Sequence, residues 1–168
     1  VVFVNHVSNA LGTVNPIKKI IDKAHRYDAK VLIDGAPAVP HFHVDVIELD
    51  VDFYVCSAHK FCGPTGVGIL YGKQSILEEL PPYQGGGEMI DEVTFEKTTY
   101  ADLPNKFEPG TPNIAGVIAS GVALDYINDI GLDNIKKYED ELLAYATKKL
   151  KEINGVKIYG ESENKTSV

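Results

Sequence analysis

The stretch VVFVNHVSNALGTVNPIKKIIDKAHRYDAKVLID, residues 1–34, decides the fold because it holds two strands with a helix between them. Residues 1–4 form a continuous β-branched and aromatic run, which is typical of a strand covered on both faces. Asn15-Pro16 supplies a helix N-cap and a proline at the first helical position, and apolar residues then recur at helical spacing. Residues 30–33 form the second strand. A strand, helix and strand joined by short links predict a parallel pair with a right-handed crossover.

Two further apolar runs extend this unit, at residues 51–55 and 67–71. We therefore expect an α/β fold with a mainly parallel sheet flanked by helices. Polar residues follow the first three strands, in the segments 5–9, 34–35 and 57–60. Because ligands of open α/β sheets bind beyond the carboxyl ends of parallel strands, these three segments should converge on one crevice.

The second half of the chain has a different residue pattern from the first. Residues 81–112 form a Gly- and Pro-rich excursion with only a weak strand signal near residues 93–95, and excursions of this length are usually functional or form interfaces. Residues 113–130 predict a helix of small residues, and residues 134–153 predict an amphipathic helix followed by a strand at residues 156–159. The stripe that the second helix should bury consists of Ile135, Leu142, Leu143, Ala146, Leu150 and Ile153.

Composition narrows the class of protein. The 168 residues are 44% hydrophobic and 24% charged, as in globular proteins, and the opening without Met together with the polar end leads us to interpret the chain as a fragment. The net charge of −8 argues against nucleic-acid partners, whose binding needs clustered Lys and Arg. No apolar run is long enough to cross a bilayer, so we expect no membrane association. The two cysteines form neither a CxxC pair nor a metal knuckle, which favours the reducing cytoplasm.

Lys60 is the first candidate for chemistry, because it follows an apolar strand and precedes a glycine-rich turn. Partial burial there would lower the pKa of its amine and make it a nucleophile toward an aldehyde. A lone lysine after a strand is more often a solvated surface residue, so this position alone decides little.

Four further residues stand at neighbouring strand ends. Asp34 could keep the ring nitrogen of a pyridine protonated by charge pairing, or it could cap a turn. Ser57 and His59 offer a hydroxyl and an imidazole to a phosphate, although each could be satisfied within a turn. Asn9 can donate a hydrogen bond to a ring substituent such as a phenolate oxygen. Together with Lys60, these residues become candidates for one cofactor site.

Six segments fall in an order and spacing that resemble fold-type-I pyridoxal enzymes of the class V aminotransferase family, in particular the SufS-like, or group II, cysteine desulfurases. The match runs over nearly the whole chain. The turn at residues 63–66 and the element at residues 85–90 favour the SufS-like group over the IscS- and NifS-like group. The segments are residues 6–13 (HVSNALGT), 34–36 (DGA), 57–60 (SAHK), 63–68 (GPTGVG), 85–90 (GGGEMI) and 107–113 (FEPGTPN).

The resemblance implies pyridoxal 5′-phosphate as the cofactor, with Lys60 binding it as a Schiff base. It also implies that Asp34 pairs with the pyridinium nitrogen and that Asn9 contacts the phenolate oxygen. Ser57 and His59 would bind the phosphate.

The resemblance further implies a homodimer in which Thr111 contacts the phosphate of the other subunit. Residues 1–130 would be part of the cofactor-binding large domain. Residues 131–168 would be a connecting helix and the beginning of a smaller carboxy-terminal α+β domain.

The chain departs from the family pattern at several positions. Pro37 stands where the family usually has a glutamine that helps to hold the phenolate oxygen, and proline has no side-chain donor. Ala58 replaces a common glycine. We interpret Cys56 and Cys62 as buried small hydrophobes, because the family has no catalytic cysteine there. The persulfide-forming cysteine and the carboxylate-binding arginine of the family match nothing in this chain.

The function implied by the resemblance is that of a cysteine desulfurase, which converts L-cysteine to L-alanine and passes sulfur to a protein cysteine as a persulfide. The sulfur would then reach an acceptor protein for iron–sulfur cluster assembly. Selenocysteine lyase or another class V aminotransferase is the alternative enzyme. A non-catalytic dimerising homologue is a further alternative, for which Pro37 is the only hint. We expect the fragment by itself to be inactive.

Overall fold

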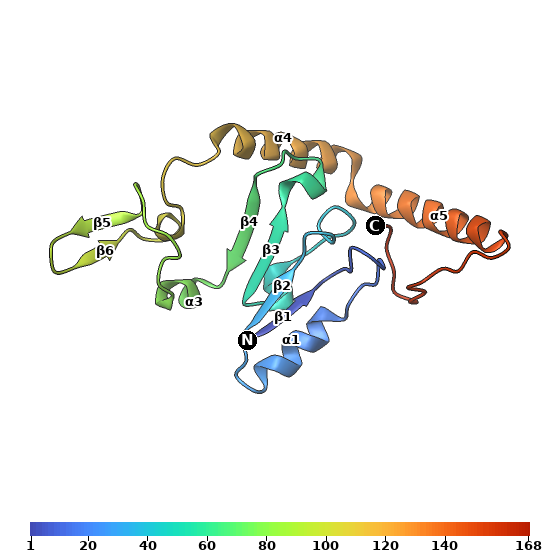
Figure 1. Cartoon of the computed structure of the whole chain (residues 1–168), viewed down its shortest axis with the longest axis horizontal. Helices are drawn as coiled ribbons and strands as arrows, with labels where there is room; N and C mark the ends of the chain where they lie inside the picture. The colour runs from blue at the N-terminus through green and yellow to red at the C-terminus, as the bar shows by residue number, and fades with distance from the viewer.

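The computed structural model describes residues 1–168 and has at its centre a four-stranded sheet with the order β1-β2-β3-β4 (Figure 1). The strands β1 (Val2–Asn5), β2 (Val31–Asp34) and β3 (Phe53–Ser57) are parallel neighbours. The fourth strand, β4 (Gly68–Gly72), pairs with β3 in the antiparallel sense. The predicted α/β class, the mainly parallel sheet and the parallel first pair are confirmed.

Helix α1 (Ile17–His25) connects β1 to β2 and buries one apolar face against the sheet. Its cap differs from the prediction, since Pro16 occupies the N-cap position and no side chain caps the helix. Asn15 instead donates its amide to the backbone oxygen and to Oδ1 of Asn5, at 2.8 Å in each case, and so ties the end of β1 to the start of α1. The core beneath α1 consists of Ile17, Ile21, Ala24, Val31, Ile33, Val51 and Tyr54.

Four short helices occur in the connections, and the sequence pattern predicted none of them. They are α2 (Val46–Leu49), η1 (Ala58–Phe61), α3 (Gln74–Glu79) and η2 (Asn105–Phe107). Each is too short for helical periodicity to show in the sequence. The first is identifiable only from its cap, because Oδ1 of Asp45 accepts two backbone N–H groups at 2.9 Å.

The second half of the chain forms a hairpin and two long helices. Strands β5 (Ile90–Val93) and β6 (Thr98–Tyr100) pair antiparallel and project away from the main sheet (Figure 1). Helix α4 (Ile114–Ile130) begins at Asn113, whose Oδ1 accepts the N–H of Gly116 at 3.0 Å. Helix α5 (Leu132–Lys151) follows after a bend of 73°.

Two predictions for this half are wrong. Residues 156–159 form no strand, because no neighbouring strand lies in place to accept and donate their backbone hydrogen bonds. The stripe predicted for residues 134–153 is not buried either, and no residue of α5 is buried in this structure. The helix extends past the sheet instead of packing along it (Figure 1).

A second small core joins the two halves of the chain around η1. Ala58 and Phe61 of η1 are 0% and 1% exposed, and Ala123 and Ile127 of α4 pack against them. The first turn of α5 reaches the same cluster through Leu132 and Ile135. The bend at Gly131 coincides with the predicted division between residues 1–130 and 131–168, which stays a prediction.

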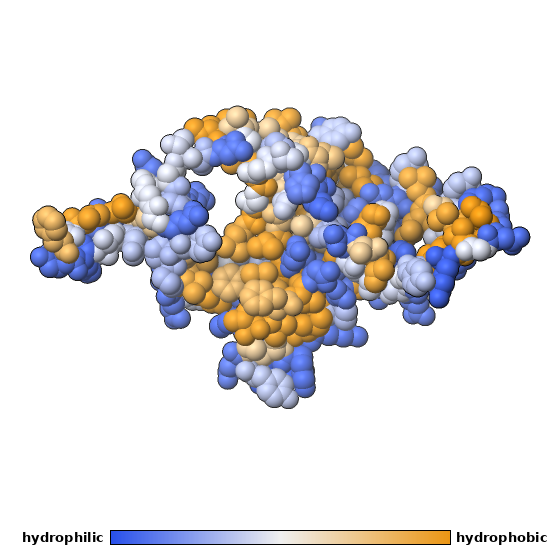
Figure 2. Space-filling view, in the orientation of Figure 1, coloured by the Kyte–Doolittle hydropathy of each residue, from blue (hydrophilic) through white to orange (hydrophobic).

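Large apolar surfaces remain uncovered. Figure 2 shows apolar residues along α4, over the sheet and on the hairpin. Phe3 on the edge strand β1 is 71% exposed, and Ile118 and Val122 on α4 are 66% and 65% exposed. No single helix has the length and hydropathy of a membrane span, and α4 and α5 meet that test only as a bent pair.

A buried charge cluster ties the amino-terminal ends of β2 and β3 to α1. Asp52 is 1% exposed, and its Oδ2 accepts the Val31 N–H at 2.8 Å and lies 2.8 Å from Nε2 of His25. The ammonium of Lys73 lies 3.6 Å from its other oxygen. Burial alone would raise the pKa of Asp52, but the two hydrogen bonds and the two neighbouring positive charges outweigh it and hold the pKa below its usual value.

We predict that Asp52→Ala destabilises the complete protein by about 1–3 kcal/mol, because it leaves the buried Val31 N–H without its acceptor, while His25 and Lys73 keep Asp50 as a partner. The contribution of Asp52 is present above its unfolded pKa of about 3.9 and is lost as the pH falls through its lower folded value. Urea unfolding at pH 7 and at stepwise lower pH measures both effects. Asp22→Ala breaks an exposed pair with Lys18 on the same helix and should cost less than about 1 kcal/mol. Equal losses in the two variants would contradict the prediction.

Candidate active site

Three strand ends meet at one edge of the sheet, as the sequence predicted. Asn5 at the end of β1 lies in register with Asp34 at the end of β2, and Asp34 lies in register with Val55 of β3. Ser57 ends β3 two residues further on and leads directly into η1 with Lys60. Because the strands are parallel, their carboxyl ends emerge on the same side.

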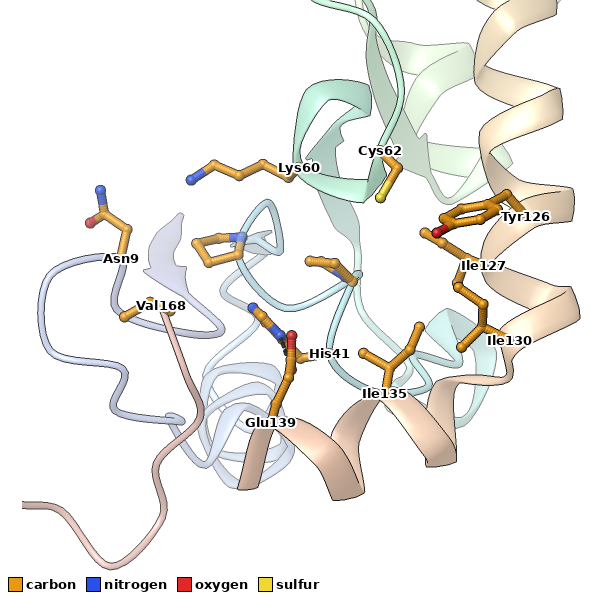
Figure 3. Close-up of a pocket in the computed structure, with 12 residues that line it drawn as sticks. Asn9, His41, Lys60, Cys62, Tyr126, Ile127, Ile130, Ile135, Glu139 and Val168 are labelled. Atoms are coloured by element: carbon orange, nitrogen blue, oxygen red, sulfur yellow. Dashed lines mark hydrogen bonds and ion pairs between the residues drawn. The ribbon is translucent and has the colours of Figure 1, made fainter. Parts of the chain in front are cut away.

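A cavity of about 450 Å³ opens next to this edge (Figure 3). Two predicted site residues, Asn9 and Lys60, line it, and in Figure 3 the amine of Lys60 extends toward Asn9. Three predicted site residues at the strand ends do not line it: Asp34, Ser57 and His59. The remaining lining comes from Pro37, Pro40, His41, Cys62, Tyr126, Ile127, Ile130, Ile135, Glu139 and Val168.

The setting of Lys60 is fixed by its neighbours in η1. Ala58 and Phe61 point into the second core, so the intervening His59 and Lys60 face outward and are exposed. The Ala58 N–H donates to the Val67 carbonyl at 3.0 Å, and the Ala58 carbonyl accepts the Gly63 N–H at 2.9 Å. These bonds hold the turn on both sides of the lysine. The predicted partial burial of Lys60 is wrong for this structure.

Asp34 is exposed, not buried as the pyridinium role would suggest. Its Oδ1 accepts the Ala36 N–H at 3.0 Å, which is the turn-capping arrangement, and Oδ2 has no hydrogen-bond partner. One oxygen of the carboxylate is therefore free for a ligand while the other shapes the turn.

A buried Tyr54–His6 pair packs against the turn that follows Asp34. The sequence pattern did not predict this role. The Tyr54 hydroxyl lies 3.0 Å from Nδ1 of His6, and both residues are buried. Burial lowers the pKa of His6 to about 4, so the ring is neutral at pH 7. Burial, assisted by the negative charges of Cys56 and Asp34, raises the pKa of the Tyr54 hydroxyl. The only sequence signal was His6 in the first family motif.

Gly35 is required by this pair, since a Cβ at this position would overlap the ring of Tyr54. We predict that Gly35→Ala lowers the free energy of unfolding by about 1–3 kcal/mol, because the turn at Asp34 must shift away from the ring. Urea unfolding of the complete protein measures the change. Gly85→Ala is the matched control, because nothing lies within 4 Å of its added Cβ. A Gly35→Ala variant as stable as Gly85→Ala would exclude this packing constraint.

The hydroxyl of Ser57 and the ring of His59 make no hydrogen bond within the chain, so both are free to bind a ligand at the end of β3. Thr111 is exposed and precedes α4. The cavity lies at the other end of that helix, which is about 25 Å long. The structure therefore does not bring Thr111 together with Lys60 within one chain.

The two cysteines differ from each other. Cys56 is half-buried, and burial raises the pKa of its thiol. Cys62 is exposed and lines the cavity, so the interpretation of both as buried hydrophobes is wrong for Cys62. Its backbone φ of 65° ends η1 in the left-handed region, which turns the side chain out of the core (Figure 3).

Comparison with known proteins identifies the family. The family described as aminotransferase class-V matches residues 1–168. The chain is 52% identical over 168 residues to a cysteine desulfurase of Synechococcus elongatus, covering 100% of this chain and 27% of that protein. It is 54% identical over 161 residues to a cysteine desulfurase of Cronobacter sakazakii, covering 95% of this chain and 40% of that protein.

Solved structures agree with the sequence matches. The Escherichia coli cysteine desulfurase CsdA superposes with a TM-score of 0.88 at 39% identity, over 91% of this chain and 38% of that one. A cysteine desulfurase of Thermococcus onnurineus superposes with a TM-score of 0.85 at 35% identity, over 89% of this chain and 38% of that one.

The chain belongs to the class V aminotransferase family. It spans between 24% and 40% of the length of the curated relatives it matches. The predicted family and fold are confirmed, whereas membership of the SufS-like group stays a prediction.

Proposed function

We propose that the complete protein is a pyridoxal-phosphate-dependent cysteine desulfurase, which converts L-cysteine to L-alanine and passes sulfur to a protein cysteine as a persulfide. The observation that carries this proposal is the match over the whole chain, at 50 to 54% identity, to relatives named cysteine desulfurases. Lys60 at the edge of the cavity supplies the amine that such chemistry needs. The persulfide-forming cysteine would lie outside these residues.

The side chains at the site fit the cofactor by their chemistry. Lys60 offers an exposed amine at the cavity, which would bind the aldehyde of the cofactor. Asp34 offers one free carboxylate oxygen for the protonated ring nitrogen. Ser57 and His59 would hold the phosphate, and Asn9 would donate to the phenolate oxygen. When bound, the cofactor supplies a sink for the electron pair left on the substrate.

The residues of this chain then have simple tasks. Asp34 would hold a proton on the ring nitrogen through its negative charge, and the turn that follows it packs against the ring of Tyr54. Lys60 would hold or move a proton at the α carbon of the substrate with its Nζ atom. Lys60 is exposed in this chain, so a further surface would have to cover it to exclude water from the site.

The proposal includes a homodimer in which Thr111 reaches the phosphate in the site of the other subunit. The placement of Thr111 before α4 supports it, since Thr111 does not line the cavity with Lys60, which lies at the other end of that helix. The uncovered apolar face of α4 offers surface for such a contact. An acceptor protein for the sulfur, a cytoplasmic location and assignment to the SufS-like group complete the proposal.

We predict that borohydride reduction of the complete protein with pyridoxal phosphate labels Lys60 alone, as located by peptide mapping. Lys60→Ala should abolish the label and lower cysteine turnover by at least about 10²–10⁴-fold, since it removes both the cofactor link and the proton carrier. Lys19→Ala, on the exposed surface of α1, should retain label and turnover. A folded complete protein that takes up no label would refute the enzyme and favour the non-catalytic homologue. Labelling with turnover of selenocysteine but not cysteine would favour selenocysteine lyase.

Pro37 offers a separate test of the cavity. It is buried and lines the cavity without a side-chain donor, at the position where the family resemblance implies a glutamine. We predict that Pro37→Gln tightens cofactor binding about 2–10-fold, because one added hydrogen bond contributes about 0.5–1.5 kcal/mol. Absorbance titration of the complete protein measures the dissociation constant. Pro37→Ala, which adds no donor, should show no gain, and an equal gain in both variants would attribute the effect to the backbone instead.

A further inference from the structure

The cavity next to Lys60 has two walls from distant parts of the chain. One wall comes from η1 and from the loop after Asp34, which carries Pro37, Pro40 and His41. The other wall comes from the end of α4 and the first half of α5. The distance between these walls sets the width of the space that the amine of Lys60 enters.

A single hydrogen-bonded pair, a histidine with a carboxylate, joins the two walls. Nδ1 of His41 lies 2.6 Å from Oε2 of Glu139, and the two residues are 98 positions apart in the sequence. Their side chains are only 13% and 26% exposed, so water screens the contact poorly. Figure 3 shows both side chains meeting below Lys60. A charge-assisted hydrogen bond of this length is among the strong polar contacts of proteins.

Helix α5 has few other attachments to the body of the protein. Its first turn packs through Leu132 and Ile135 on the second core. After Glu139, no hydrogen bond or ion pair of α5 reaches the sheet or the loops that precede α4. The helix then runs away from the sheet (Figure 1). Glu139 is therefore the last residue of α5 with a direct polar contact to the opposite cavity wall. The far end of the helix is attached only through the tail, where Lys151 pairs with Glu161 and residues 164–166 bond to residues 12–14.

Hydrogen-bonded turns in the loop on the opposite wall connect the position of His41 to that of Asp34. The His41 N–H donates to the Ala38 carbonyl at 3.0 Å, and the Ala38 N–H donates to the Gly35 carbonyl at 2.8 Å. These successive turns restrict the backbone between His41 and Gly35, and Gly35 follows Asp34 directly. A shift of His41 would therefore displace the carboxylate turn as well as the cavity wall.

We propose that His41 and Glu139 form a clamp that holds α5 against the loop of residues 35–42 and sets the width of the cavity that Lys60 lines. Both are positioning residues, since neither is placed on reacting atoms. The second half of the inference, that the clamp retains the cofactor, rests on the proposed function. The first half concerns the protein without cofactor and stands separately.

The test is hydrogen exchange, read by mass spectrometry, on the complete protein without cofactor. Glu139→Ala and His41→Leu should accelerate exchange at residues 37–42 and 132–142 by about tenfold to a hundredfold, since hydrogen bonds to charged groups are worth about 1.5–3 kcal/mol. Asp140→Ala is the matched control, because it breaks the exposed pair with Lys136 one position further along the same helix. His41→Asn should keep the slow exchange of the wild-type protein. The amide nitrogen of the asparagine is as many bonds from Cα as Nδ1 of the histidine is, so it can donate to Glu139.

Exchange in Glu139→Ala equal to that in Asp140→Ala would overturn the clamp. The second readout is the rate at which pyridoxal phosphate dissociates, followed by its absorbance. It should rise about tenfold in Glu139→Ala and His41→Leu, and stay near the wild-type rate in His41→Asn and Asp140→Ala. Faster exchange with unchanged dissociation would overturn the role in cofactor retention. If the wild-type protein takes up no cofactor on Lys60, the proposed function fails while the exchange data still decide the clamp.

Discussion

The parallel pairing of β1, β2 and β3 is the constraint on which the site depends. Parallel strands must be joined by crossovers, so their carboxyl ends all emerge at one edge, and the residues after them meet there without needing to be close in sequence. The register from Asn5 to Asp34 and from Asp34 to Val55 places these ends side by side. The charge cluster around Asp52 holds the opposite ends of β2 and β3 in place.

Small buried residues then convert strand ends into shaped turns. Ala58 is fully buried, so that His59 and Lys60 must face outward on η1. Gly35 lies against the ring of Tyr54 with no room for a side chain, which fixes the turn that presents Asp34. In both places a candidate site residue, Lys60 or Asp34, is positioned by a small, unreactive neighbour, Ala58 or Gly35. Side chains that cannot react thus determine where the reactive ones point.

The sequence predicted those parts of the fold that local pattern controls. The strands and α1 were recognised because continuous apolar runs and helical spacing are visible within short windows, and the convergence of Asn9, Asp34 and Lys60 toward one edge follows from topology. The predictions that failed depend on tertiary contacts between distant parts of the chain. Residues 156–159 have strand composition but no pairing partner. The stripe of α5 is not buried, although Ile135 packs on the second core, and the hydrogen bond between His41 and Glu139 spans 98 positions.

The exposure of the site follows from the same cause as the exposure of the apolar faces. The chain of 18.3 kDa exposes 11305 Å² of surface, whereas a self-contained monomer of this mass exposes roughly 8,000 Å². The outer edge of β1, the face of α4 and the hairpin of β5 and β6 all present large apolar side chains to solvent. We expect these surfaces to be covered in the complete, assembled protein, and the same covering would exclude water from Lys60 and Asp34. Removal of water from these two candidate groups would therefore be coupled to assembly of the whole protein. Residues 1–168 carry Lys60 and Asp34 but leave both exposed to solvent.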